Sequence, residues 1–130
     1  YMILRINFFL RLVVAIILIQ SLFFKFTGHA QAVHIFSTLG VEPWGRIVLG
    51  CIELIIGVSL LIPKSRTVAT LAAMGVMAGA LGAHLFTPLC IVVTWEGNSD
   101  KGQLFIIALI TFIFCILCLI LDRKIKNTTL

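Results

Sequence analysis

Residues 104–121 read LFIIALITFIFCILCLIL and contain no charged side chain. A helix needs about 20 apolar residues to cross a hydrocarbon core about 30 Å thick, so this stretch predicts a transmembrane helix. Three other apolar stretches of comparable length precede it in the chain. The sequence therefore predicts an all-α membrane protein, a bundle of four transmembrane helices with spans at about 4–26, 43–62, 67–85 and 103–121.

The composition agrees with this architecture. Of 130 residues, 61% are hydrophobic and only 12% are charged. A soluble domain needs a charged surface, and this chain lacks the residues to form one. Four spans use most of the chain, so we expect residues 1–130 to form a single transmembrane domain.

The basic residues predict the orientation of the spans and the main partner. More of them lie on the side of the termini and the 63–66 turn than on the side of segments 27–46 and 86–102. This bias predicts that both termini are cytoplasmic. The net charge of +5 comes from residues at the ends of apolar stretches, which form no groove-sized cluster. We therefore expect the lipid bilayer as a partner and no nucleic acid.

The two outer segments differ in character. Ala32 and Phe36 belong to a set of apolar residues at helical spacing, and Gly40 is suited to end a helix. We expect a short interfacial helix in this first outer segment. In the second outer segment, residues 88–95 are apolar and β-prone, so we expect them to pack down as a lid, and residues 96–102 form a predicted turn.

Small residues concentrate in the third span, where Gly75 and Gly79 form a GxxxG motif. Close backbone approach is the main source of contact energy between helices in lipid. We expect these glycines to pack inside the bundle and to make the third helix its most enclosed one. Dimerisation through the same motif is the alternative.

Ionisable residues at membrane depth indicate the candidate site. Glu53 lies within the second span, and a charged carboxylate there needs a partner or takes up a proton. Lys25 and His84 lie near the same ends of the first and third helices, so we expect all three side chains to converge. The cluster is either an interhelical bond that fixes the packing or a pocket for a headgroup, a quinone or a proton. Arg11 is expected to reach the cytoplasmic headgroups with its long side chain.

The four cysteines fall into two pairs. Cys115 and Cys118 form a CxxC inside the fourth span, where hydrocarbon denies a thiol both access and thiolate character, so we interpret them as small apolar side chains. Cys51 and Cys90 lie toward the outer side and are candidate redox thiols.

Metal binding is not expected. Haem ligation between two helices requires a histidine on each, and only His84 lies in a predicted span, whereas His29 and His34 lie in the outer segment. These histidines and Cys90 have no spacing typical of a zinc site.

Several short motifs together resemble the DoxX-like family: FKFTG at 24–28, IFSTLG at 35–40, EPWGR at 42–46, GCIEL at 50–54, LLIP at 60–63, His84-Leu85, and GQLF at 102–105. The resemblance spans most of the chain. It implies a four-helix bundle in a bacterial inner membrane. The family takes its name from a subunit of an archaeal terminal quinol oxidase system, and some relatives are linked to thiol and oxidative-stress chemistry.

Three functions follow as expectations. The first is a non-catalytic or accessory subunit that associates with other membrane protein subunits, in a respiratory or other redox assembly. The second is a small membrane oxidoreductase or quinone-binding protein that uses Glu53, His84, Lys25 and Cys51, with quinone as its ligand. The third is a small-solute transporter, which the absence of paired broken helices disfavours. Whether the chain is an enzyme stays open.

Overall fold

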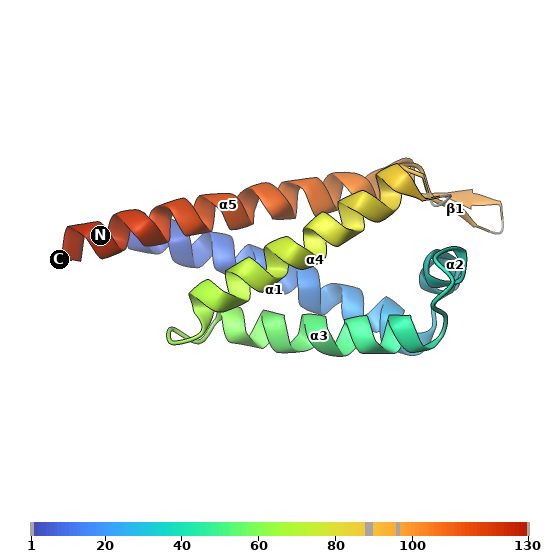
Figure 1. Ribbon diagram of the computed structural model, residues 1–130, viewed down its shortest axis with the longest axis horizontal. Coiled ribbons are helices and arrows are strands. Elements are labelled where there is room, and N and C mark those ends of the chain that lie inside the picture. Colours follow the sequence, from blue (N-terminus) through green and yellow to red (C-terminus); the bar gives the residue numbers. More distant parts are fainter. Residues whose placement is uncertain (1, 88–89, 96, 130) are drawn as a thin grey trace.

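A computed structural model of the protein describes residues 2–87, 90–95 and 97–129. Pro88, Leu89 and Glu96 of the predicted lid and turn lie outside the described residues. The described part is mainly helical, with one small antiparallel hairpin in which Thr94 pairs with Ser99. Its elements are α1 (Met2–Thr27), α2 (Ala30–Thr38), α3 (Trp44–Leu60), α4 (Arg66–Phe86), β1 (Thr94–Trp95), β2 (Asn98–Ser99) and α5 (Gln103–Thr129) (Figure 1).

The four long helices form an elongated bundle. α1 packs on α3 and α5, and α4 packs on α5 and α3. Figure 1 shows both chain ends at one end of the bundle, and α2 with the hairpin at the other. Toward the α2 end, α3 diverges from α4 and α5, and α2 contacts α3 and β1 there.

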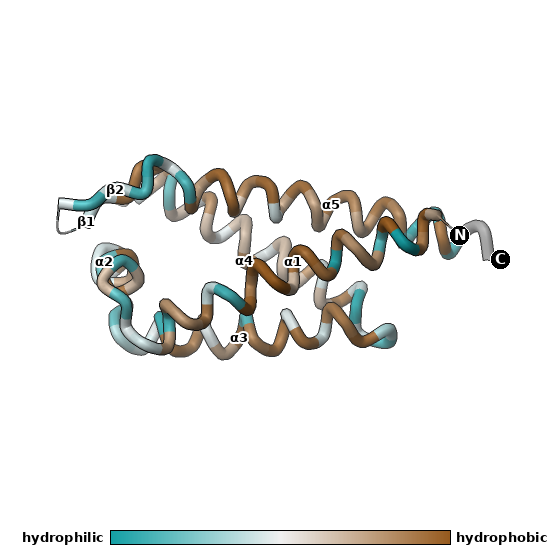
Figure 2. The backbone as a smooth tube through the Cα atoms, turned by 180° about the vertical axis from the view of Figure 1, so that it is seen from behind, coloured by the Kyte–Doolittle hydropathy of each residue, from teal (hydrophilic) through white to brown (hydrophobic). Residues whose placement is uncertain are grey.

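Three helices, α1, α4 and α5, are long and apolar enough to cross a membrane by length and composition. The outer surface of the bundle is also apolar, with exposed large side chains such as Phe8, Phe9 and Ile55. Figure 2 shows hydrophobic colouring along most of the length of the long helices. Soluble monomers rarely expose such extended apolar surface.

The second predicted span corresponds to α3, which is shorter than expected. Its 17 residues reach about 26 Å at about 1.5 Å per residue, which is at the short end for a membrane helix. The helix ends at Leu60, and the turn that follows satisfies its last carbonyls. The Ser59 oxygen accepts hydrogen bonds from the Ile62 N–H at 3.2 Å and from the Ser65 hydroxyl at 2.9 Å. A span over α3, and hence the four-span bundle, stays a prediction.

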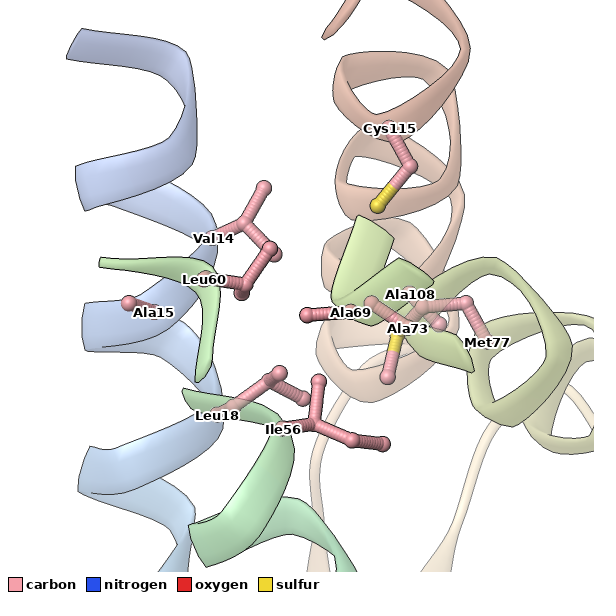
Figure 3. Close-up of a cluster of buried hydrophobic side chains, with 10 residues drawn as sticks. All are labelled: Val14, Ala15, Leu18, Ile56, Leu60, Ala69, Ala73, Met77, Ala108 and Cys115. Atoms are coloured by element: carbon pink, nitrogen blue, oxygen red, sulfur yellow. The ribbon is translucent and has the colours of Figure 1, made fainter. Parts of the chain in front are cut away.

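A buried apolar cluster holds the middle of the bundle together. Val14, Leu18, Ile56 and Leu60 of α1 and α3 face small side chains of α4 and α5, and Met77 lies beside Ala73 and Ala108 (Figure 3). Cys115 belongs to this cluster, and Cys118 is also buried. The cluster consists of Val14, Ala15, Leu18, Ile56, Leu60, Ala69, Ala73, Met77, Ala108 and Cys115.

The expected packing of the GxxxG glycines inside the bundle is wrong. A Cβ atom added at Gly75 or Gly79 would meet no other atom within 4 Å. α4 instead buries its alanine face against its neighbours, which leaves the glycine face open. The tight crossing lies between α1 and α3, where a Cβ added at Gly57 would approach Cγ1 of Ile19 to 2.8 Å.

Candidate binding pocket

A buried ion pair joins α1 to α3. Lys25, in the last turn of α1, places its Nζ 3.1 Å from Oε1 of Glu53, whose side chain is 5% exposed. Ser21 lies one helical turn before Lys25 and so on the same face of α1. Its Oγ accepts a hydrogen bond from Lys25 Nζ at 3.1 Å. Its single O–H lies within hydrogen-bonding distance of two acceptors, Oε2 of Glu53 at 3.1 Å and the Leu18 carbonyl at 2.8 Å. Partners of this kind offset the cost of burying a charged carboxylate.

Arg46 fixes the end of α1 that carries Lys25. Its guanidinium pairs with Glu42, with Nε 2.9 Å from Oε1, and also donates a hydrogen bond to the backbone carbonyl of Lys25. The start of α3 is thereby tied to the end of α1. This contact positions the backbone from which the Lys25 side chain reaches Glu53.

His84 lies near the end of α4 and contacts the loop that follows. Its Nδ1 is 2.8 Å from the backbone oxygen of Cys90. A carbonyl only accepts, so Nδ1 carries the proton in this contact, and Nε2 of a neutral ring is then an acceptor. The ring also packs edge-on against Phe105, with centroids 5.8 Å apart. His84 is thus hydrogen-bonded to the loop and packed against α5. It forms no hydrogen bond with Glu53.

The ion pair and His84 nevertheless line one cavity of about 680 Å³. Every helix contributes to its wall, and Trp95 of β1 lines it from the hairpin. Most of the wall is apolar, including side chains of α2 such as Ile35 and Phe36. Its polar part includes Ser21, Lys25, Glu53, His84, Asp100 and Gln103.

Asp100 holds the hairpin against the start of α5. Its carboxylate accepts backbone N–H bonds from Val93 at 2.9 Å, from Gly102 at 2.8 Å and from Leu104 at 3.3 Å. The side chain is buried, as is Val93. The sequence predicts Asp100 only as part of a turn, although an Asp shortly before an apolar helix is a typical capping signal.

The two candidate thiols do not line this cavity. Cys51 lies two residues before Glu53 on α3, and its side chain is exposed where that of Glu53 is buried. Cys90 is exposed in the loop after α4, where its backbone has φ of 64°. No disulfide joins Cys51 to Cys90. A redox role for either thiol stays a prediction.

A second polar cluster lies at the opposite end of the bundle. Arg11 is 2% exposed and forms an ion pair with Oδ1 of Asp122 on α5. The Thr67 hydroxyl donates to Oδ2 of Asp122 at 3.3 Å, and Asn7 donates to the Cys118 carbonyl at 3.1 Å. The expectation that Arg11 extends to the headgroups is therefore wrong, because Asp122 provides a partner inside the protein.

Within residues 2–87, 90–95 and 97–129, no three histidine, cysteine or acidic side chains gather as a metal ion would require. Comparison with protein-family models, with curated proteins and with solved structures finds no match to this chain. The cavity and its polar wall are therefore the features of this chain that indicate a function.

Proposed function

We propose that this protein is a DoxX-like, four-span membrane protein that binds an amphipathic small molecule of the quinone class in the cavity at the α2 end. One observation carries the proposal. A largely apolar cavity of about 680 Å³ has the Lys25–Ser21–Glu53 cluster in its wall. Cavities of about 300–1,000 Å³ with apolar walls and a few convergent polar groups are typical of small-molecule sites.

The polar wall fits the oxygens of a quinone head. A lysine ammonium has three N–H donors, and two of those of Lys25 are directed to Glu53 and Ser21. The third N–H of Lys25 and the side-chain amide of Gln103 can donate hydrogen bonds to the carbonyl oxygens of a quinone, which act only as acceptors. The apolar ring and tail suit the remaining wall. Gly79 lines the cavity and has open space beside it. Through this space the apolar tail of a quinone can extend from the cavity toward the lipid.

The charge distribution supports four spans with the cavity on the outer side. Lys64 lies in the turn between α3 and α4, and Arg66 begins α4, at the same end of the bundle as the basic end of α5. When α3 crosses the membrane, this turn lies in the cytoplasm, the side on which loops carry an excess of basic residues. The hairpin and α2 then lie outside.

Cysteine labelling tests this topology. In a protein with Cys51→Ser and Cys90→Ser, we expect a membrane-impermeant maleimide to label Asn98→Cys in intact spheroplasts. Lys64→Cys should be labelled only after lysis. A protein in which α3 lies on the membrane surface would give the reverse result, because Lys64 would then be outside and Asn98 inside.

Tryptophan fluorescence tests ligand binding. The chain has two tryptophans, the exposed Trp44 at the start of α3 and Trp95 in the cavity wall. In the variant Trp44→Phe, all tryptophan fluorescence therefore comes from Trp95. We expect a short-chain ubiquinone analogue to quench Trp95 saturably in detergent or nanodiscs. Lys25→Met should weaken binding by about tenfold or more, since a hydrogen bond from a charged donor contributes about 1.5–3 kcal/mol.

Lys101→Met is the matched control for that experiment. Lys101 lies at the same end of the bundle but does not line the cavity, so its loss should leave the affinity unchanged. Thermal melts verify that each variant is folded. Quenching that rises linearly with added quinone, and equally in all variants, would reflect partition into lipid or detergent and would contradict the proposal.

A second candidate function is that of an accessory subunit. The observation in its favour is the open glycine face of α4, where Cβ atoms added at Gly75, Gly79 and Gly82 would meet nothing within 4 Å. Small residues at this spacing let another transmembrane helix approach closely. A partner that copurifies with the wild-type protein and is lost with Gly75→Leu would support this role.

A further inference from the structure

A second cavity lies at the end of the bundle opposite the binding pocket. Its volume is about 480 Å³, and it is formed between the first turn of α4 and the last turns of α5. Three basic residues line it, namely Arg66, Arg123 and Lys126. Thr67 and Asp122 complete its polar wall, and the rest is apolar.

The single acidic residue in this wall is already neutralised within the protein. Oδ1 of Asp122 pairs with the buried Arg11, and Oδ2 accepts a hydrogen bond from Thr67. Arg11 itself does not line the cavity. The negative charge of Asp122 is therefore balanced from the inner side, and Arg66 and Arg123 give the cavity an excess of positive charge.

The position of the cavity relative to the apolar surface identifies its ligand. α4 and α5 are two of the helices that are apolar enough to cross a membrane, and the cavity lies where their apolar stretches give way to charged residues. This is the depth of lipid headgroups. Arginine guanidinium groups bind phosphate oxygens with paired, charge-assisted hydrogen bonds, and basic pockets between membrane helices bind anionic headgroups.

We propose that this cavity binds the phosphate of an anionic phospholipid, with the headgroup between Arg66 and Arg123 and the acyl chains along the apolar surface of α4 and α5. The site lies at the other end of the bundle from the proposed quinone pocket. It is independent of the function proposed for that pocket.

Native mass spectrometry of protein released from nanodiscs tests the site, with phosphatidylglycerol as a minor component in phosphatidylcholine. We expect the wild-type protein to retain phosphatidylglycerol preferentially. Arg123→Gln should lower its apparent affinity by about tenfold, the loss expected for a charge-assisted hydrogen bond. Arg123→Lys, which keeps the charge but not the paired geometry, should give an intermediate affinity.

Lys64→Gln is the matched control, because it removes one positive charge at the same end without touching the cavity. It should retain phosphatidylglycerol as the wild-type protein does. Equal losses in Arg123→Gln and Lys64→Gln would indicate general surface attraction and would overturn the proposal. If an equal concentration of inorganic phosphate displaces phosphatidylglycerol, the site recognises free phosphate and not a lipid, and the proposal is overturned. Melting curves in pure phosphatidylcholine confirm that the variants are folded.

Discussion

Arg11→Leu should lower the free energy of unfolding by about 3–5 kcal/mol, the typical cost of removing one partner from a buried ion pair. Arg11 is 2% exposed and pairs with Asp122, so its loss leaves the Asp122 carboxylate without its ion-pair partner on α1. The pair also joins the first helix to the last. Reversible unfolding in mixed micelles, followed by circular dichroism, measures the effect.

The double variant Arg11→Leu/Asp122→Leu provides the control. Removing both charges eliminates the unpaired carboxylate, so most of the lost stability should return, since apolar replacements of buried pairs are often nearly neutral. A double variant as unstable as the sum of the two single variants would contradict an energetic coupling between these residues. So would an Arg11→Leu protein that unfolds like the wild type.

Gly57→Leu should destabilise the bundle by about 3 kcal/mol, at the upper end of what overpacking costs. Even a Cβ atom at Gly57 would approach Ile19 to 2.8 Å, and the backbone oxygen of Ala15 lies 3.7 Å away on the same side. A leucine side chain therefore fits only if Ile19 is displaced or α1 and α3 separate. The same unfolding assay, together with loss of the monodisperse peak in size-exclusion chromatography, measures the result.

Gly75→Leu is the matched substitution on α4. An added Cβ meets nothing within 4 Å there, so the folded chain should accommodate the leucine with little change in stability. A larger destabilisation by Gly75→Leu than by Gly57→Leu would mean that α4, and not the crossing of α1 and α3, is the tight contact of this bundle.

The sequence was informative about helix positions and about the presence of a polar site. Gly40 and Pro63 lie beyond the ends of α2 and α3, and a helix occupies the segment in which Ala32 and Phe36 predict one. Ser21 was missed, although its spacing of four from Lys25 places both on one helix face. That spacing could have added it to the candidate site.

Contacts between helices were the part that sequence patterns did not determine. Periodicity shows which residues share a face, but not which face meets which neighbour. The GxxxG motif of α4 therefore suggested internal packing, whereas the close approach occurs at Gly50 and Gly57 of α3. The Arg11–Asp122 pair likewise depends on how α1 lies against α5, which no local signal specifies.

The most direct test of the central proposal is to map where a quinone binds. A photoreactive azidoquinone should label peptides that line the cavity at the α2 end, in particular residues 17–25 of α1 and 103–108 of α5. Excess unlabelled ubiquinone analogue should suppress this labelling, and Lys25→Met should reduce it in the folded protein. Labelling confined to lipid-facing stretches such as residues 8–9, unaffected by competitor, would contradict a quinone site in this cavity.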